Sequence, residues 1–261
     1  MAATTRTEAG DMEAAGIEAA IRAAGTAERA AASQAYLKTS LETVGTTVPE
    51  ARSQLRAWLR ARPELTRAEL LAVVTGLWAR PVFECHMAAG LLLTERRTLL
   101  MAADIGLLEE LLRTSGTWAL VDSLSADVAG SLVERYPELT AVLDRWAAHP
   151  DFWIRRSAML ALLIPLRRGD GDFDRFARYA DHMLEEREFF IRKAIGWVLR
   201  ETAKRRPELV AQWLTPRVHR ASGVTVREAV KWLPPAQRDE LLAAYRASRP
   251  AGRSATPNSP R

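Results

Sequence analysis

The hydrophobic positions along the chain repeat with the period of an α-helix almost throughout. Apolar residues recur at three- and four-residue spacing, and no stretch alternates apolar and polar residues over strand length. Prolines and glycines fall between the apolar segments, where helices end. The pattern predicts an all-α protein. Its helices are expected over residues 14–24, 28–44, 49–60, 64–78, 82–92, 94–102, 105–113, 117–135, 138–148, 151–165, 172–184, 188–204, 207–213, 223–231 and 235–246.

The tripeptide Pro-Glu-Leu marks three of the expected helix starts, at Pro63, Pro137 and Pro207. Proline suits the first position of a helix, and a glutamate beside it favours the positive end of the helix dipole. The spacings are 74 and 70 residues, twice the length of a typical two-helix repeat. We therefore expect a solenoid of HEAT-like antiparallel helix pairs. It would form one domain over residues 13–246, between disordered ends at 1–12 and 247–261.

Composition narrows the possible chemistry. The single cysteine, Cys85, excludes an intramolecular disulfide and a cysteine-based zinc site, and the four histidines are scattered. We expect no metal and no cofactor. The net charge of +5 favours a polyanionic partner, although alanine- and arginine-rich composition also follows from GC-rich coding. No apolar run approaches the roughly 18 residues of a membrane span, and no signal peptide is visible. These features predict a cytoplasmic protein that binds no membrane.

A tryptophan on the expected helix 188–204 lies away from the apolar face. Trp197 has Lys193, Arg200 and Lys204 as its neighbours at helical spacing. Two interpretations are open. The indole could pack on a neighbouring helix while the cations are simply solvated, which is the commoner arrangement. Alternatively, this face could meet DNA, with the cations on phosphates and the indole against a base or sugar.

Two further segments carry candidate chemistry. Trp118 and Asp122 are spaced i, i+4 at the margin of an apolar helix face, so the carboxylate could stabilise a positive charge held beside the indole. They could equally be a boundary tryptophan and a surface aspartate. Arg155 and Arg156 interrupt a helix that is apolar nearly all round. A buried arginine needs an anionic partner, either a structural acid or a DNA phosphate.

Together these segments resemble the AlkD-type DNA alkylation repair glycosylases, a family of HEAT-like helical repeats. The likeness is close at "EFFIRKAIGWVLRE" (residues 188–201) and continues into "AKRRPELV". It is fair at "YPELTAVLDRWAAHPDFWIRRSAMLALL" and partial at "TWALVDS", and weaker similarity extends it over about residues 34–232. The resemblance implies a concave DNA-binding surface on the helical repeats.

The resemblance also implies an activity and roles for single residues. Members excise positively charged alkylated purines, such as N3-methyladenine and N7-methylguanine, from duplex DNA without flipping the base. The catalytic aspartate of the family falls on Asp122, its two stacking tryptophans on Trp118 and Trp197, and its phosphate-binding arginine on Arg156. A tyrosine near the DNA backbone matches Tyr36.

Several positions depart from the family pattern and leave alternatives open. Thr117 and Ala119 stand where a second tryptophan and an acid are common, and Thr47 replaces a frequent glutamine. These departures bear on affinity and lesion range. We expect a monomeric, monofunctional glycosylase, because the chemistry needs no Schiff-base lysine. The alternatives are a non-catalytic DNA-structure-binding protein of the same fold and a protein-binding helical scaffold.

Overall fold

The computed structural model describes residues 2–248, and within them the regular structure is helical, with one isolated backbone bridge between Glu42 and Val82. This confirms the predicted all-α class. The α-helices are α1 (Ala2–Ala24), α2 (Ala27–Leu37), α3 (Val48–Arg60), α4 (Arg67–Trp78), α5 (Phe83–Glu95), α6 (Ile105–Thr114), α7 (Trp118–Ser123), α8 (Gly130–Arg135), α9 (Thr140–Ala147), α10 (Phe152–Leu160), α11 (Leu163–Arg168), α12 (Phe173–Met183), α13 (Phe189–Ala203), α14 (Pro207–Leu214), α15 (Gly223–Ala229) and α16 (Pro235–Ala247). Short 3₁₀ turns are η1 (Arg97–Leu99), η2 (Ala102–Asp104), η4 (Pro137–Leu139), η5 (Thr215–Arg217) and η6 (Val230–Trp232), and η3 (Leu124–Ala129) is a π-helical segment.

The chain divides into two compact units, at residues 1–161 and 162–261. The first unit contains α1 to α10 and the second contains α11 to α16. The expectation of one domain over residues 13–246, built as a solenoid of paired helices, stays a prediction. Each unit has its own buried apolar side chains and is described by itself below.

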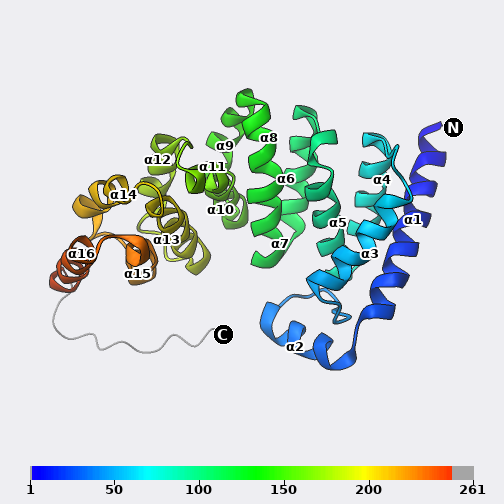
Figure 1. Cartoon of the computed structure of the whole chain (residues 1–261), viewed down its shortest axis with the longest axis horizontal. Coiled ribbons are helices and arrows are strands. Elements are labelled where there is room, and N and C mark those ends of the chain that lie inside the picture. Colours follow the sequence, from blue (N-terminus) through cyan, green and yellow to red (C-terminus); the bar gives the residue numbers. More distant parts are fainter. Residues whose placement is uncertain (1, 249–261) are drawn as a thin grey trace. The chain divides into compact units, whose positions relative to one another are not determined.

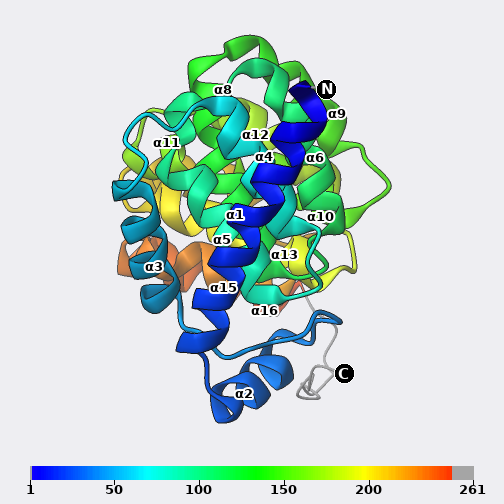
Figure 2. The same cartoon turned by 90° about the vertical axis from the view of Figure 1, so that its right-hand side faces the viewer.

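In the first unit, α1 packs along α4, and α4 packs on α5 (Figures 1 and 2). The sequence predicts disorder over residues 1–12, whereas in the structure α1 begins at Ala2. Gly10 is buried there, and a Cβ on it would come within 2.6 Å of the Cβ of Ala72. Small residues that suggest disorder in the sequence thus allow a close helix contact.

Helix α2 is the exception in this unit, since it has no buried residue and lies at the lower edge of the unit in both views (Figures 1 and 2). The predicted helix 28–44 is too long, because Lys38 adopts a left-handed conformation (φ 50°) and ends α2 at Leu37. The connection to α3 is held by Glu84, whose carboxylate accepts hydrogen bonds from the backbone N–H groups of Val44 (3.0 Å) and Gly45 (2.8 Å). This buried acid therefore fixes the segment that follows α2.

Between α5 and α6 the structure departs from the predicted helix 94–102. Two 3₁₀ turns, η1 and η2, occupy this stretch instead. Asp104 ends the second turn, where it is buried, pairs with Arg67 of α4 and accepts from the backbone N–H of Met101 at 2.7 Å. A tertiary ion pair thus holds the end of η2 in place.

The predicted helix 117–135 forms as three consecutive segments, α7, η3 and α8. The π-helical turn of η3 lies next to α10, and the Ser125 hydroxyl of η3 lies within hydrogen-bond distance of the Val121 carbonyl oxygen (2.5 Å) and of the Ser157 hydroxyl of α10 (2.8 Å). π-Helical turns concentrate at functional sites because they change the direction of the side chains on either side.

The second unit is built around α13, which packs on α11, α14, α15 and η6. Gly196 permits the contact with α15, since a Cβ there would lie 2.7 Å from the Cβ of Glu228 and 2.9 Å from the carbonyl oxygen of Thr225. Along residues 2–248 no helix is both long and apolar enough to span a membrane. The predicted disorder of the C-terminal tail concerns residues that, from 249 on, lie outside the described range.

Candidate functional site

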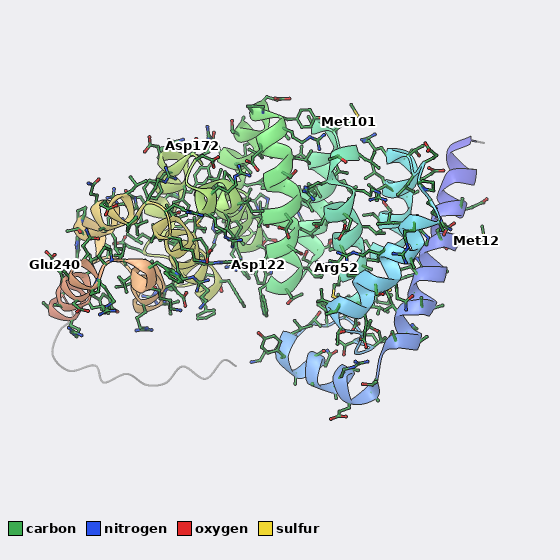
Figure 3. The ribbon with its side chains drawn as sticks, viewed as in Figure 1. Met12, Arg52, Met101, Asp122, Asp172 and Glu240 are labelled. Carbon is green, nitrogen blue, oxygen red and sulfur yellow. The ribbon has the colours of Figure 1, made fainter. Side chains whose placement is uncertain are left out.

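Asp122 and Arg156 form a two-pronged ion pair in the first unit. Asp122 lies near the end of α7, just before the π-helical turn, and is labelled in Figure 3. Its Oδ1 accepts from Nε of Arg156 at 2.8 Å, and its Oδ2 accepts from Nη2 at 2.9 Å. The arginine side chain is 3% exposed and the aspartate side chain 18% exposed. The buried guanidinium therefore holds a carboxylate that still reaches solvent.

Burial raises the pKa of Asp122 above the ordinary value of an aspartate, while the Arg156 guanidinium opposes that rise through its hydrogen bonds and its charge. A carboxyl in this setting is a stronger base than a free aspartate. It also loses its charge at a less acidic pH than a free aspartate does.

Two aromatic side chains accompany this pair. Trp118 begins α7 one turn before Asp122 and is half-buried. The exposed Tyr36, at 70% of its full surface, comes from α2 and meets the Trp118 ring edge to face, with centroids 5.7 Å apart at 88°. Edge-to-face packing is a preferred aromatic geometry. The structure thus brings Tyr36, Trp118, Asp122 and Arg156 together from three helices of one unit.

Arg155 points elsewhere. Its Nη1 donates to the carbonyl oxygens of His149 and Pro150, both at 2.7 Å. These bonds secure the turn between α9 and α10. A DNA contact by Arg155 stays a prediction.

The predicted basic surface of the second unit is built on α13. Trp197 is half-buried there. Lys193 Nζ donates to Glu228 Oε1 at 2.7 Å, and Arg200 bonds the other oxygen of the same carboxylate. The neighbouring cations are therefore organised by an acid rather than simply solvated.

Glu201 anchors the other half of this arrangement. It accepts from Lys204 (2.7 Å), from Arg167 of α11 (2.9 Å) and from Arg200 (3.3 Å). Lys231 of η6 adds a third bond to Glu228 at 2.8 Å. We call this group the α13 cation cluster. It comprises Arg167, Lys193, Arg200, Lys204 and Lys231 around Glu201 and Glu228.

The pKa values of both glutamates of the cluster are lowered from the ordinary value of a glutamate. Burial alone raises the pKa of Glu228, but its bonds from Lys193 and Lys231 and the charges of Lys193 and Arg200 outweigh burial and lower that pKa to about 2. Burial likewise acts against Glu201, whose pKa is nevertheless lowered by the bond from Lys204 and the charge of Arg167. Both carboxylates are buried, whereas the cations around them are partly exposed.

Sequence reasoning overlooked both glutamates. Glu201 closes the segment "EFFIRKAIGWVLRE", and Glu228 stands three residues before Lys231. An acid on the apolar side of an expected helix is the signal that could have found them, because a buried carboxylate requires cationic partners. Among the described residues, no group of histidine, cysteine, aspartate and glutamate side chains is arranged to hold a metal ion.

A family model described as DNA alkylation repair enzyme matches residues 17–233. The chain belongs to this family. The match spans both units and includes Asp122, Arg156 and Trp197, so the DNA alkylation repair family supplies the context for both surfaces described above.

Solved structures show the same fold. A predicted DNA alkylation repair enzyme from Enterococcus faecalis is 22% identical, with a TM-score of 0.73, covering 81% of this chain and 97% of its own. AlkD2 from Streptococcus mutans is 16% identical, with a TM-score of 0.54, covering 68% of this chain and 87% of its own. No curated protein matches the chain in sequence. Family membership therefore rests on the family model, and the fold on the structures.

Proposed function

We propose that this member of the DNA alkylation repair family is a monofunctional glycosylase that acts on duplex DNA. Its substrates are positively charged alkylated purines, such as N3-methyladenine and N7-methylguanine. The observation that carries the proposal is the Asp122 carboxylate, held by the buried Arg156 yet open to solvent beside Trp118. A purely structural ion pair has no need to leave its acid accessible.

The chemistry follows from the charge of the substrate. Alkylation makes the purine cationic, so the base can leave with the electrons of the glycosidic bond and become neutral without protonation. Positive charge then develops on the deoxyribose. The fixed carboxylate of Asp122 stabilises that charge, as a preorganised group does best in a partly buried site.

Water completes the reaction. Its oxygen bonds to C1′ of the sugar as the C1′–N bond breaks, and its proton passes to the carboxylate or to solvent. The raised pKa of Asp122 suits this role of base. No amine of the protein bonds to the sugar, so strand cleavage is not expected.

The aromatic side chains contribute attraction for the cationic sugar. Trp118 lies one helical turn from Asp122 and is braced by Tyr36. An indole face is worth roughly 0.5 to 2 kcal/mol to a nearby cation. Trp197 of the second unit is proposed as the other stacking residue, and excision without base flipping is proposed from the family resemblance.

The test is release of free methylated bases from methylated duplex DNA under single-turnover conditions. We expect the native protein to release N3-methyladenine or N7-methylguanine. Asp122→Asn should slow release by about 10²- to 10³-fold, the usual loss on removing one transition-state contact, while DNA affinity stays within a factor of a few.

A matched control, Asp127→Asn, replaces an acid outside the group of Tyr36, Trp118, Asp122 and Arg156. It should leave the rate of base release unchanged. Full release by Asp122→Asn would remove the residue from the mechanism. A native protein that is folded and binds DNA but releases no base would favour a DNA-structure-binding role, and the absence of both would leave a helical scaffold.

A further inference from the structure

Trp232 is a large aromatic side chain that takes little part in the core. It ends η6, two residues after the buried Val230, and is 57% exposed. Tryptophan is usually well buried, and among the described residues few large apolar side chains are this open. An indole held on a surface is therefore a candidate for binding a partner.

The surface around Trp232 is fixed in place. η6 packs on α13, the helix that carries Trp197. Nζ of Lys204 lies 5.5 Å from the centre of the Trp232 ring and is also bonded to Glu201. Lys231, the neighbour of Trp232 in the chain, is bonded to Glu228. Lys204 beside the indole and Lys231 next to it in the chain are thus both anchored to buried acids.

The charge of this surface selects its partner. Five cations surround two carboxylates, so the cluster keeps an excess of positive charge. The acids are 5% and 9% exposed, whereas Lys204 and Lys231 are 38% and 49% exposed. A partner therefore meets cations and an aromatic face. This combination suits a nucleic-acid backbone, in which phosphates alternate with the apolar faces of sugars.

We propose that Trp232, Lys204 and Lys231 bind the sugar–phosphate backbone of duplex DNA, independently of any damaged base. The two ammonium groups contact phosphates, and the indole packs on a deoxyribose between them. The proposal extends the proposed function, since it gives the second unit a DNA contact that is separate from the Asp122 site. Nothing in it requires the chemistry of Asp122.

The test measures binding of the full chain to an undamaged, fluorescently labelled duplex over a range of salt concentrations. Trp232→Ala should weaken binding roughly fivefold or more, the size of a lost aromatic contact to a nucleotide, without changing the salt dependence. Lys204→Gln should lower the slope of log affinity against log salt by about one, because one phosphate contact is lost.

Two controls separate this role from a structural one. Trp232→Phe keeps an aromatic face and should bind within about twofold of the native protein, if a ring face is what the backbone contacts. Arg178→Gln removes the same charge from an exposed site on α12 and should leave the salt slope unchanged. Thermal unfolding of each variant checks that the fold is kept.

Either proposal can fail alone. Native affinity in Trp232→Ala, or a native slope in Lys204→Gln, would overturn the backbone contact even in a protein that releases methylated bases. A protein that shows both effects but releases no base would support the backbone contact and contradict the glycosylase.

Discussion

Each unit contains ion pairs in which one partner is buried, but the buried partner is the cation in the first unit and the anion in the second. In the first unit, Arg156 is buried and its partner Asp122 reaches solvent. In the second, Glu201 and Glu228 are buried and their cations face solvent. An exposed anion suits a centre where positive charge develops, and exposed cations suit a surface that receives phosphates. The residue buried in a pair therefore decides what the pair can do.

Among the variants that test this difference between the units, Arg156→Gln is expected to have the largest effect on stability and activity. The variant leaves Asp122 without its cation, and breaking a buried pair in this way costs about 3 kcal/mol of unfolding free energy. The pKa of Asp122, already raised by burial, should rise further. Because the carboxylate is the active form, the acid limb of the pH–rate profile for base release should move to higher pH.

Salt dependence decides between two roles for Arg156. The family resemblance assigns it to a DNA phosphate, whereas its Nε and Nη2 donate to Asp122 in the structure. An unchanged salt slope in Arg156→Gln means that it positions the aspartate, and a slope lower by about one means a phosphate contact. Arg156→Lys keeps the charge and should shift the acid limb less. An acid limb that stays in place in both variants would contradict the coupling.

Glu228→Gln tests the second unit, where the buried partner of the ion pairs is the acid. Lys193, Arg200 and Lys231 would lose their shared acid, and we expect a loss of about 2 kcal/mol of unfolding free energy. The folded-state pKa of about 2 lies below the ordinary 4.5, so this stabilisation is complete above pH 4.5 and is lost as pH falls towards 2. Urea unfolding over that range should show a weaker pH dependence in the variant.

Glu185→Gln is the control, because Glu185 is an exposed acid that bonds Arg220. It should change stability by less than about 0.5 kcal/mol. Equal losses in the two variants would mean that the cation cluster has no special dependence on its buried acid.

The sequence predicted the helices well and the contacts between them poorly. The expected helix 188–204 became α13 (Phe189–Ala203), because caps and apolar periodicity are local signals. The expected helix 94–102 is replaced by η1 and η2, and the second turn ends at Asp104, which bonds Arg67 far away in the chain. The expected helix 151–165 is interrupted between Leu160 and Leu163. Periodicity reports which face is apolar, not which partner that face will meet.

The candidate site divides in the same way. Trp118 and Asp122 could be paired from their spacing alone, Arg155 and Arg156 stood out in an apolar helix, and the resemblance selected Arg156. The bidentate bond across 34 positions of sequence, and the choice of Asp122 over a phosphate as its partner, are tertiary facts. Glu228 was missed because two of its three partners, Lys193 and Arg200, lie on another helix, α13.

The smallest expected effect concerns the helix contact that supports the cation cluster. Gly196→Ala would place a methyl group 2.7 Å from the Cβ of Glu228 and 2.9 Å from the Thr225 carbonyl, so α13 and α15 must separate slightly. We expect a loss of about 1 to 2 kcal/mol, measured by urea unfolding. Gly16→Ala, in an open position on α1, should be neutral or stabilising by up to about 1 kcal/mol. If the two variants changed the unfolding free energy equally, the close contact between α13 and α15 would not constrain position 196.

The π-helical turn η3 has a consequence for how this protein tolerates change in length. A π-turn holds one residue more than an α-helical turn, which sets the two flanking helices out of phase by about 100°. That offset lets α7 present Asp122 to solvent while α8 keeps Leu132 in the core. Removing one residue from Leu124–Ala129 would leave a continuous helix with either the aspartate or the leucine on the wrong side. A single additional residue in η3 thus sets the angular register between α7 and α8.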